Sequence, residues 1–172
     1  MLTLSALLLS ASQAAAATTN VAVGTFYFDP AQVNILINDS VQWNWVETPG
    51  YFHSTTHFGA LWNSPVQMTG SFTFMFTNTG YYPYVCTLHQ WMYGSVSVRY
   101  PPPAISNPQR VAGEFRFTYS AITNAWYIVE SSTDLTQWRG ETTNKATAAT
   151  VSYTNAALHN LQYYRVRRLF DP

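Results

Sequence analysis

The stretch Tyr82–Val98, YPYVCTLHQWMYGSVSV, decides both the fold and the candidate site of this chain. Apolar and polar residues alternate before Cys86 and again after Gly94, which predicts two β-strands joined by a short loop. The loop carries a thiol, an imidazole and a thioether at Cys86, His89 and Met92. This set of ligands suits copper in a trigonal site, with His and Cys in the plane and Met weakly axial.

Cys86 is the only cysteine, so it forms no internal disulfide. Residues 1–17, MLTLSALLLSASQAAAA, read as a secretory signal peptide. Their apolar run is too short to span a bilayer, and the alanines before Thr18 offer cleavage sites. We therefore expect a periplasmic or secreted protein, in which an unpaired thiol needs a reason such as a metal.

Outward from the opening stretch, the pattern is one of short strands. Apolar residues alternate in Val21–Phe28, Val33–Ile37, Val41–Trp45 and Phe72–Phe76, and the runs are separated by Gly, Pro, Asn and Asp. This pattern is typical of an antiparallel sandwich or barrel, so the chain is predicted to be all-β. Beyond Pro101-Pro102-Pro103, five more strand-like runs follow: Glu114–Tyr119, Trp126–Glu130, Leu135–Arg139, Thr147–Tyr153 and Leu161–Arg168.

Three consecutive prolines cannot join a strand ladder and favour a stiff spacer. The predicted organisation is therefore a signal peptide at 1–17, a first β-domain at 18–100, a Pro-rich linker at 101–108 and a small β module at 109–172. Charge supports the division, since all eight Lys and Arg residues lie from Arg99 onward. With zero net charge and no basic patch, nucleic-acid binding is not expected, and no segment is long enough to span a membrane.

The first domain resembles the small cupredoxins, the blue type 1 copper proteins of the amicyanin and plastocyanin type, over about residues 20–99. The spacing C-x2-H-x2-M before a Gly-x-Val-x-Val strand carries the resemblance, together with Asp39–Trp43 and Phe52-His53-Ser54. It implies a Greek-key β-sandwich with one type 1 copper ion held by His53, Cys86, His89 and Met92. In the longer loop of some family members, the axial ligand would fall at Gly94. Glycine has no side chain that could bind a metal.

Two points within this site have alternatives. His57 lies four residues after His53, on the same face of a strand, and only the resemblance favours His53. Trp91, with Leu88 and Pro83, would line an apolar patch around the edge of His89 in the family, whereas Trp91 alone is as compatible with core packing. Ser54 stands where relatives carry Asn, a neighbour that tunes the metal.

The resemblance implies carriage of single electrons outside the cytoplasm by Cu(I)/Cu(II) cycling, with a redox partner such as a c-type cytochrome or an oxidoreductase. We expect no enzyme: four histidines are too few for the copper oxidases, and no G-x-S-x-G or Walker motif is present. The alternative is a secreted copper-binding, structural or adhesive sandwich without a role in electron transfer.

The second unit resembles small fibronectin-like modules of secreted bacterial proteins, through Tyr127–Trp138 and Tyr163–Val166. It is interpreted as a spacer, docking or cell-surface attachment unit. Trp126, Trp138 and Tyr153 would suit a glycan platform, but core packing is the favoured interpretation because aromatic residues dominate small cores. His159 is predicted to be an exposed loop residue.

Overall fold

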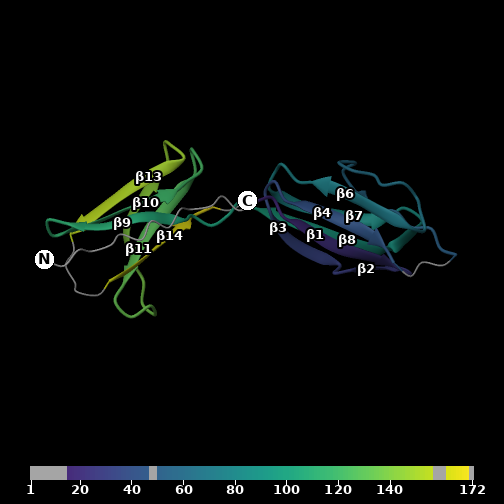
Figure 1. The fold of residues 1–172 in the computed structure, drawn as a ribbon, viewed down its shortest axis with the longest axis horizontal. Helices are drawn as coiled ribbons and strands as arrows, with labels where there is room; N and C mark the ends of the chain where they lie inside the picture. The colour runs from purple at the N-terminus through teal and green to yellow at the C-terminus, as the bar shows by residue number, and fades with distance from the viewer. Residues whose placement is uncertain (1–14, 47–49, 157–161, 171–172) are drawn as a thin grey trace, which may run out of the picture. The chain divides into compact units, whose positions relative to one another are not determined.

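Strands begin at Thr18 in the computed structural model, which describes residues 15–46, 50–156 and 162–170. Every regular element of these residues is a β-strand, so the predicted all-β class is confirmed (Figure 1). The described residues form two units, and the boundary between them along the chain falls between Pro101 and Pro102. Within those residues we find no helix with the length and apolarity needed to cross a membrane. Most of the predicted signal peptide lies outside the described residues.

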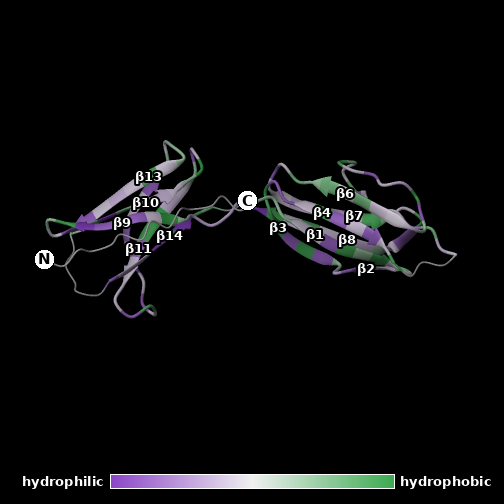
Figure 2. Cartoon of the chain, in the orientation of Figure 1, coloured by the Kyte–Doolittle hydropathy of each residue, from purple (hydrophilic) through white to green (hydrophobic). Residues whose placement is uncertain are grey.

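The first unit consists of two four-stranded sheets that share one core. One sheet has the order β2 (Tyr27–Asp29), β1 (Thr18–Gly24), β4 (Ser40–Trp45), β6 (Gly70–Met75). The other has the order β3 (Gln32–Leu36), β8 (His89–Arg99), β7 (Gly80–Cys86), β5 (Thr56–His57). The buried residues of both sheets form one core, which makes a β-sandwich. Figure 2 shows hydrophobic and hydrophilic segments along the strands of these sheets.

The predicted antiparallel arrangement is wrong at two pairs of strands. β1 lies parallel to β4, from Thr18 opposite Ser40, and β3 lies parallel to β8, from Gln32 opposite Ser95. Parallel neighbours need a crossover between them. The chain supplies it by passing from β2 in one sheet to β3 in the other and back to β4. The alternation of apolar and polar residues shows which face of a strand is buried. It does not show whether the neighbouring strand runs parallel or antiparallel to it.

A tight hairpin breaks the first predicted run of strand. Gly24 of β1 lies opposite Tyr27 of β2, so Thr25 and Phe26 form the loop. The ring of Tyr27 occupies the space that a side chain at Gly24 would need. Phe26 adopts a φ of +67°, in the left-handed region that non-glycine residues seldom occupy. Phe26 therefore lies in the loop of the hairpin and not in the continuous strand that the sequence pattern predicted.

The second unit contains two three-stranded sheets. One has the order β13 (Thr150–Ala156), β10 (Glu114–Ser120), β9 (Ile105–Val111), and the other β12 (Arg139–Lys145), β11 (Trp126–Ser132), β14 (Tyr163–Arg168). Its core includes Tyr153, which is 8% exposed, while Trp138 lies under the guanidinium of Arg165, 4.2 Å from the ring centroid. The favoured interpretation as core packing therefore holds for Tyr153 and is wrong for Trp126, which is 44% exposed; with Tyr153 buried, the three rings form no common platform.

Two predicted segments differ from the structure. Residues 133–138 form a turn before β12 in place of the expected strand at Leu135–Arg139. Asp134 Oδ1 accepts hydrogen bonds from the backbone N–H groups of Thr136 and Gln137, each at 2.8 Å, and Leu135 adopts a φ of +64°. Strand β9 begins inside the linker predicted at 101–108, and its Pro108 is tolerated because β9 is an edge strand.

Candidate metal centre

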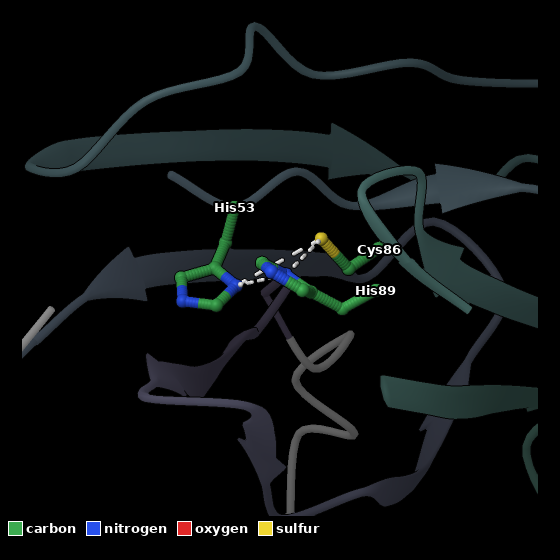
Figure 3. Close-up of side chains that lie close together, drawn as sticks. All are labelled: His53, Cys86 and His89. Carbon is green, nitrogen blue, oxygen red and sulfur yellow. Dashed lines mark hydrogen bonds between the residues drawn. The ribbon is translucent and has the colours of Figure 1, made fainter. Parts of the chain in front are cut away.

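Three side chains from two parts of the first unit converge at one end of the sandwich. His53 lies in the loop after β4, Cys86 ends β7 and His89 begins β8. The Nδ1 atoms of the two histidines are 3.2 Å apart, and the Cys86 Sγ lies 3.8 Å from His53 Nδ1 and 3.5 Å from His89 Nδ1. Figure 3 shows the three groups pointing toward one another. His53 and Cys86 are fully buried.

The spacing of these atoms fits a single metal ion. Bonds of about 2.0 Å to nitrogen and about 2.3 Å to sulfur, at trigonal or tetrahedral angles, separate two nitrogens by roughly 3.3–3.5 Å and nitrogen from sulfur by roughly 3.5–3.7 Å. The distances of 3.2, 3.5 and 3.8 Å match this arrangement closely. Two imidazoles and one thiolate form a donor set that suits copper. The cluster is therefore suited to bind copper.

Hydrogen bonds fix the backbone of His53. Its N–H donates to the carbonyl of Gln67 and its carbonyl accepts from the N–H of Gln67, both at 3.0 Å. The indole N–H of Trp45 donates to the same carbonyl at 3.2 Å. Burial, reinforced by the nearby His89, lowers the pKa of His53 and so favours the neutral imidazole, the form that binds a metal. Its Nε2 is buried with no partner among the described residues.

Ser54 connects the His53 loop to the loop that follows Cys86. Its backbone N–H donates to the Cys86 Sγ at 3.4 Å, which helps to fix the position of the sulfur. Its Oγ accepts from the N–H of Thr87 at 3.0 Å and lies 2.8 Å from the Thr87 hydroxyl. The hydroxyl thus joins the two ligand-bearing loops. Sequence reasoning noted the change at Ser54 but not its partner Thr87.

Aromatic rings flank His89, which is partly exposed. The ring of Phe26 meets the imidazole edge to face at a centroid distance of 4.8 Å, and Trp91 lies at 5.5 Å. Trp91 is 67% exposed, which excludes the alternative that it packs in the core. Leu88 is exposed as well. Sequence reasoning missed Phe26, although Gly24 before it was a signal for a turn.

The other residues that the sequence analysis considered for the site differ in their position relative to the donor cluster. Met92 is buried in the same core as Cys86. A Cβ at Gly94 would meet the ring of Tyr84 and the carbonyl of Ala31, so no side chain fits at the position of the longer-loop alternative. His57 stacks on Trp62 at a centroid distance of 4.9 Å and is not part of the donor cluster. His159 lies outside the described residues.

No protein-family model matches this sequence, and no curated protein matches it either. Among solved structures, an oxidised Met-to-Leu mutant of amicyanin is 23% identical, with 46% of this chain and 79% of that chain covered and a TM-score of 0.41. A purple cupredoxin from Nitrosopumilus maritimus is 21% identical, with 46% and 97% covered and a TM-score of 0.42. At these identities and TM-scores, the likeness does not assign the chain to a family.

Proposed function

We propose that this protein binds one copper ion as a type 1 site and carries single electrons outside the cytoplasm. The observation that carries the proposal is the convergence of three donor atoms, His53 Nδ1, Cys86 Sγ and His89 Nδ1, within 3.2–3.8 Å of one another. When bound, copper supplies a one-electron Cu(I)/Cu(II) couple. The function is carriage of an electron and not turnover of a substrate.

The chain's part is to hold the donors still. Cys86 and His89 lie at the paired ends of β7 and β8, opposite each other in the register. His53 is held by its two backbone hydrogen bonds to Gln67 and by Trp45. Donors fixed in this way move little when the charge at the site changes, which keeps the reorganisation that accompanies electron transfer small. Met92, buried in the same core, is proposed as the weak axial ligand.

Electrons are proposed to enter and leave through His89. Of the three clustered side chains it is the one that is not fully buried. Around it the surface is apolar: Trp91, Leu88 and Phe26 are 67%, 53% and 37% exposed. An uncharged, apolar surface permits close approach of another redox protein, such as a c-type cytochrome or an oxidoreductase.

The test measures electron exchange directly. The copper-loaded full chain is reduced with ascorbate and mixed in a stopped-flow instrument with an oxidised c-type cytochrome, and Trp91→Asp is compared with Tyr27→Phe as an exposed control. We expect one electron transferred per copper and a rate at least 10-fold slower in Trp91→Asp. A copper site that binds one ion but exchanges no electrons would contradict electron carriage and leave a copper-binding or adhesive sandwich.

Location and the role of the second unit are further parts of this proposal. We place the protein in the periplasm or outside the cell because residues 1–17 have the pattern of a signal peptide. Attachment to a cell surface through the module at 109–172 stays a prediction. Secretion in the presence of residues 1–17, and retention in the cell without them, is the expected result of a fractionation experiment.

A further inference from the structure

A groove of about 280 Å³ lies on the first unit, away from the core of the sandwich. It is formed on the sheet that contains β3, β7 and β8, and it is open to solvent. Three aromatic and three uncharged polar residues supply most of its lining: Phe58, Tyr81, Tyr93, Gln32, Gln90 and Ser95. Its volume is at the lower end of the range for ligand pockets, about 300–1,000 Å³, and so fits a short part of a longer ligand.

The strand register explains why a groove forms here. On β7 and β8 the pairs Tyr81–Ser97, Pro83–Ser95 and Val85–Tyr93 lie opposite one another. Tyr81 and Tyr93 therefore stand on either side of a low floor formed by Pro83 and Ser95. The N–H of Phe58 donates to the carbonyl of Pro83 at 3.2 Å, which places a third ring beside the same floor.

The three rings are not used by the core. Phe58, Tyr81 and Tyr93 are 65%, 65% and 69% exposed, whereas Tyr84 of the same sheet is fully buried. Exposed rings gathered around one groove offer flat apolar faces together with phenol hydroxyls. This is the arrangement expected where a ligand, and not the protein, covers the rings.

The polar groups of the groove define the ligand. Among the residues that the structure describes, none with a charged side chain and no histidine lines the groove. Gln32 and Gln90 each offer an amide that both donates and accepts hydrogen bonds, and the tyrosines and Ser95 add hydroxyls. A matching ligand is uncharged, carries many hydroxyl groups and has an apolar face that stacks on an aromatic ring. Neutral sugars have this chemistry.

The backbone around the groove argues against an extended peptide. β8 pairs with β3 and β7, and β7 pairs with β8 and β5. At the floor itself, Ser95 lies between Gln32 and Pro83, and the Pro83 carbonyl already accepts a hydrogen bond from Phe58, so these two residues offer no free main-chain edge to a peptide strand. From these observations we propose that the groove between Tyr81, Tyr93 and Phe58 binds a neutral oligosaccharide, a site separate from the copper ligands and independent of electron carriage.

The test uses the full chain and a panel of neutral hexasaccharides: cellohexaose, xylohexaose, mannohexaose and chitohexaose. Binding is measured by isothermal titration calorimetry and located by backbone NMR shifts. We expect at least one sugar to bind, with shifts centred on Tyr81, Tyr93 and Gln32. Tyr81→Ala and Tyr93→Ala should each weaken it at least 10-fold, while Tyr81→Phe keeps the ring and most of the affinity.

Phe170→Ala is the matched control, because Phe170 is 74% exposed and belongs to the second unit. Its affinity for the sugar should equal that of the original chain. Three results would overturn the proposal: no binding of any panel member at millimolar concentration, binding that Tyr81→Ala and Tyr93→Ala leave unchanged, or binding of a decaproline peptide at this groove in place of the sugars.

Discussion

The backbone at Gly94, just after the candidate ligand loop, is closely packed against Tyr84 and Ala31. The substitution Gly94→Ala tests this packing. A Cβ at this position would lie 2.5 Å from the Tyr84 hydroxyl oxygen and 2.7 Å from the carbonyl oxygen of Ala31. Tyr84 is fully buried, so its ring has no free space to enter. The Ala31 carbonyl accepts a hydrogen bond from the N–H of Ser95 at 2.8 Å. Alanine therefore forces one of these groups to move.

The expected cost combines two effects. Overpacking a well-filled core costs about 1–3 kcal/mol. Displacing the carbonyl of Ala31 weakens its hydrogen bond to Ser95, which adds about 1 kcal/mol. Gly94→Ala should therefore lower the free energy of unfolding of the first unit by about 2–4 kcal/mol. For a domain of this size the melting temperature falls by about 4–8 °C per kcal/mol, so a decrease of roughly 8–32 °C is expected.

The assay is urea and thermal unfolding of the full chain, followed at the indole NMR signals of Trp43 and Trp62, which belong to the core of the first unit. Gly50→Ala is the control. Its Cβ would meet no described residue within 4 Å, so the φ of +81° is the strain that opposes it and a loss of about 1 kcal/mol is expected. Tyr84→Phe combined with Gly94→Ala should recover part of the loss. A Gly94→Ala variant as stable as the original chain would refute the packing argument.

Three further predictions concern the two units. Ser54→Ala removes the hydroxyl that joins the His53 loop to Thr87, so copper affinity in a chelator competition should fall about 10-fold; an unchanged affinity would deny Ser54 a role. His53→Ala should abolish the intense visible copper band and His57→Ala should keep it; the reverse outcome would exchange their roles. Arg167 and Arg165 lower the pKa of Glu130 from 4.5 to about 2. The stability that this carboxylate gives the second unit, on the order of 3 kcal/mol, should be present above pH 4.5 and lost as the pH falls toward 2. Urea unfolding of the original chain and of Glu130→Gln will show this, and a pH dependence unaltered by Glu130→Gln would contradict it.

Local pattern is sufficient for much of the first unit. Alternation predicted Val41–Trp45 and the strand through Tyr84, and the same side chains are buried in the structure. The spacing of Cys86 and His89 predicted that they lie together, since a tight loop between paired strands leaves them no other place. His53 needed the resemblance, because sequence spacing alone does not distinguish it from His57.

Other features of the structure could not be predicted from the sequence pattern, because they depend on contacts that hydrophobic periodicity does not reveal. Parallel pairing of β1 with β4 requires a crossover between sheets, which alternation does not report. Phe26 reaches His89 only because a hairpin places it there, at a φ that its residue type seldom adopts. In the second unit, Asp134 and Ser132 bind backbone N–H groups and so replace a predicted strand with a turn. Polar side chains that compete for the backbone are not visible as hydrophobic periodicity.

The central claim is that His53, Cys86 and His89 hold one redox-active copper ion, and the visible spectrum tests it most directly. The chain from Thr18 to Pro172 is titrated with Cu(II) beside Cys86→Ser. We predict an intense blue band that saturates at one copper per chain, disappears on reduction with ascorbate and is absent from Cys86→Ser. A colourless protein that binds copper weakly, and no differently from Cys86→Ser, would contradict the claim.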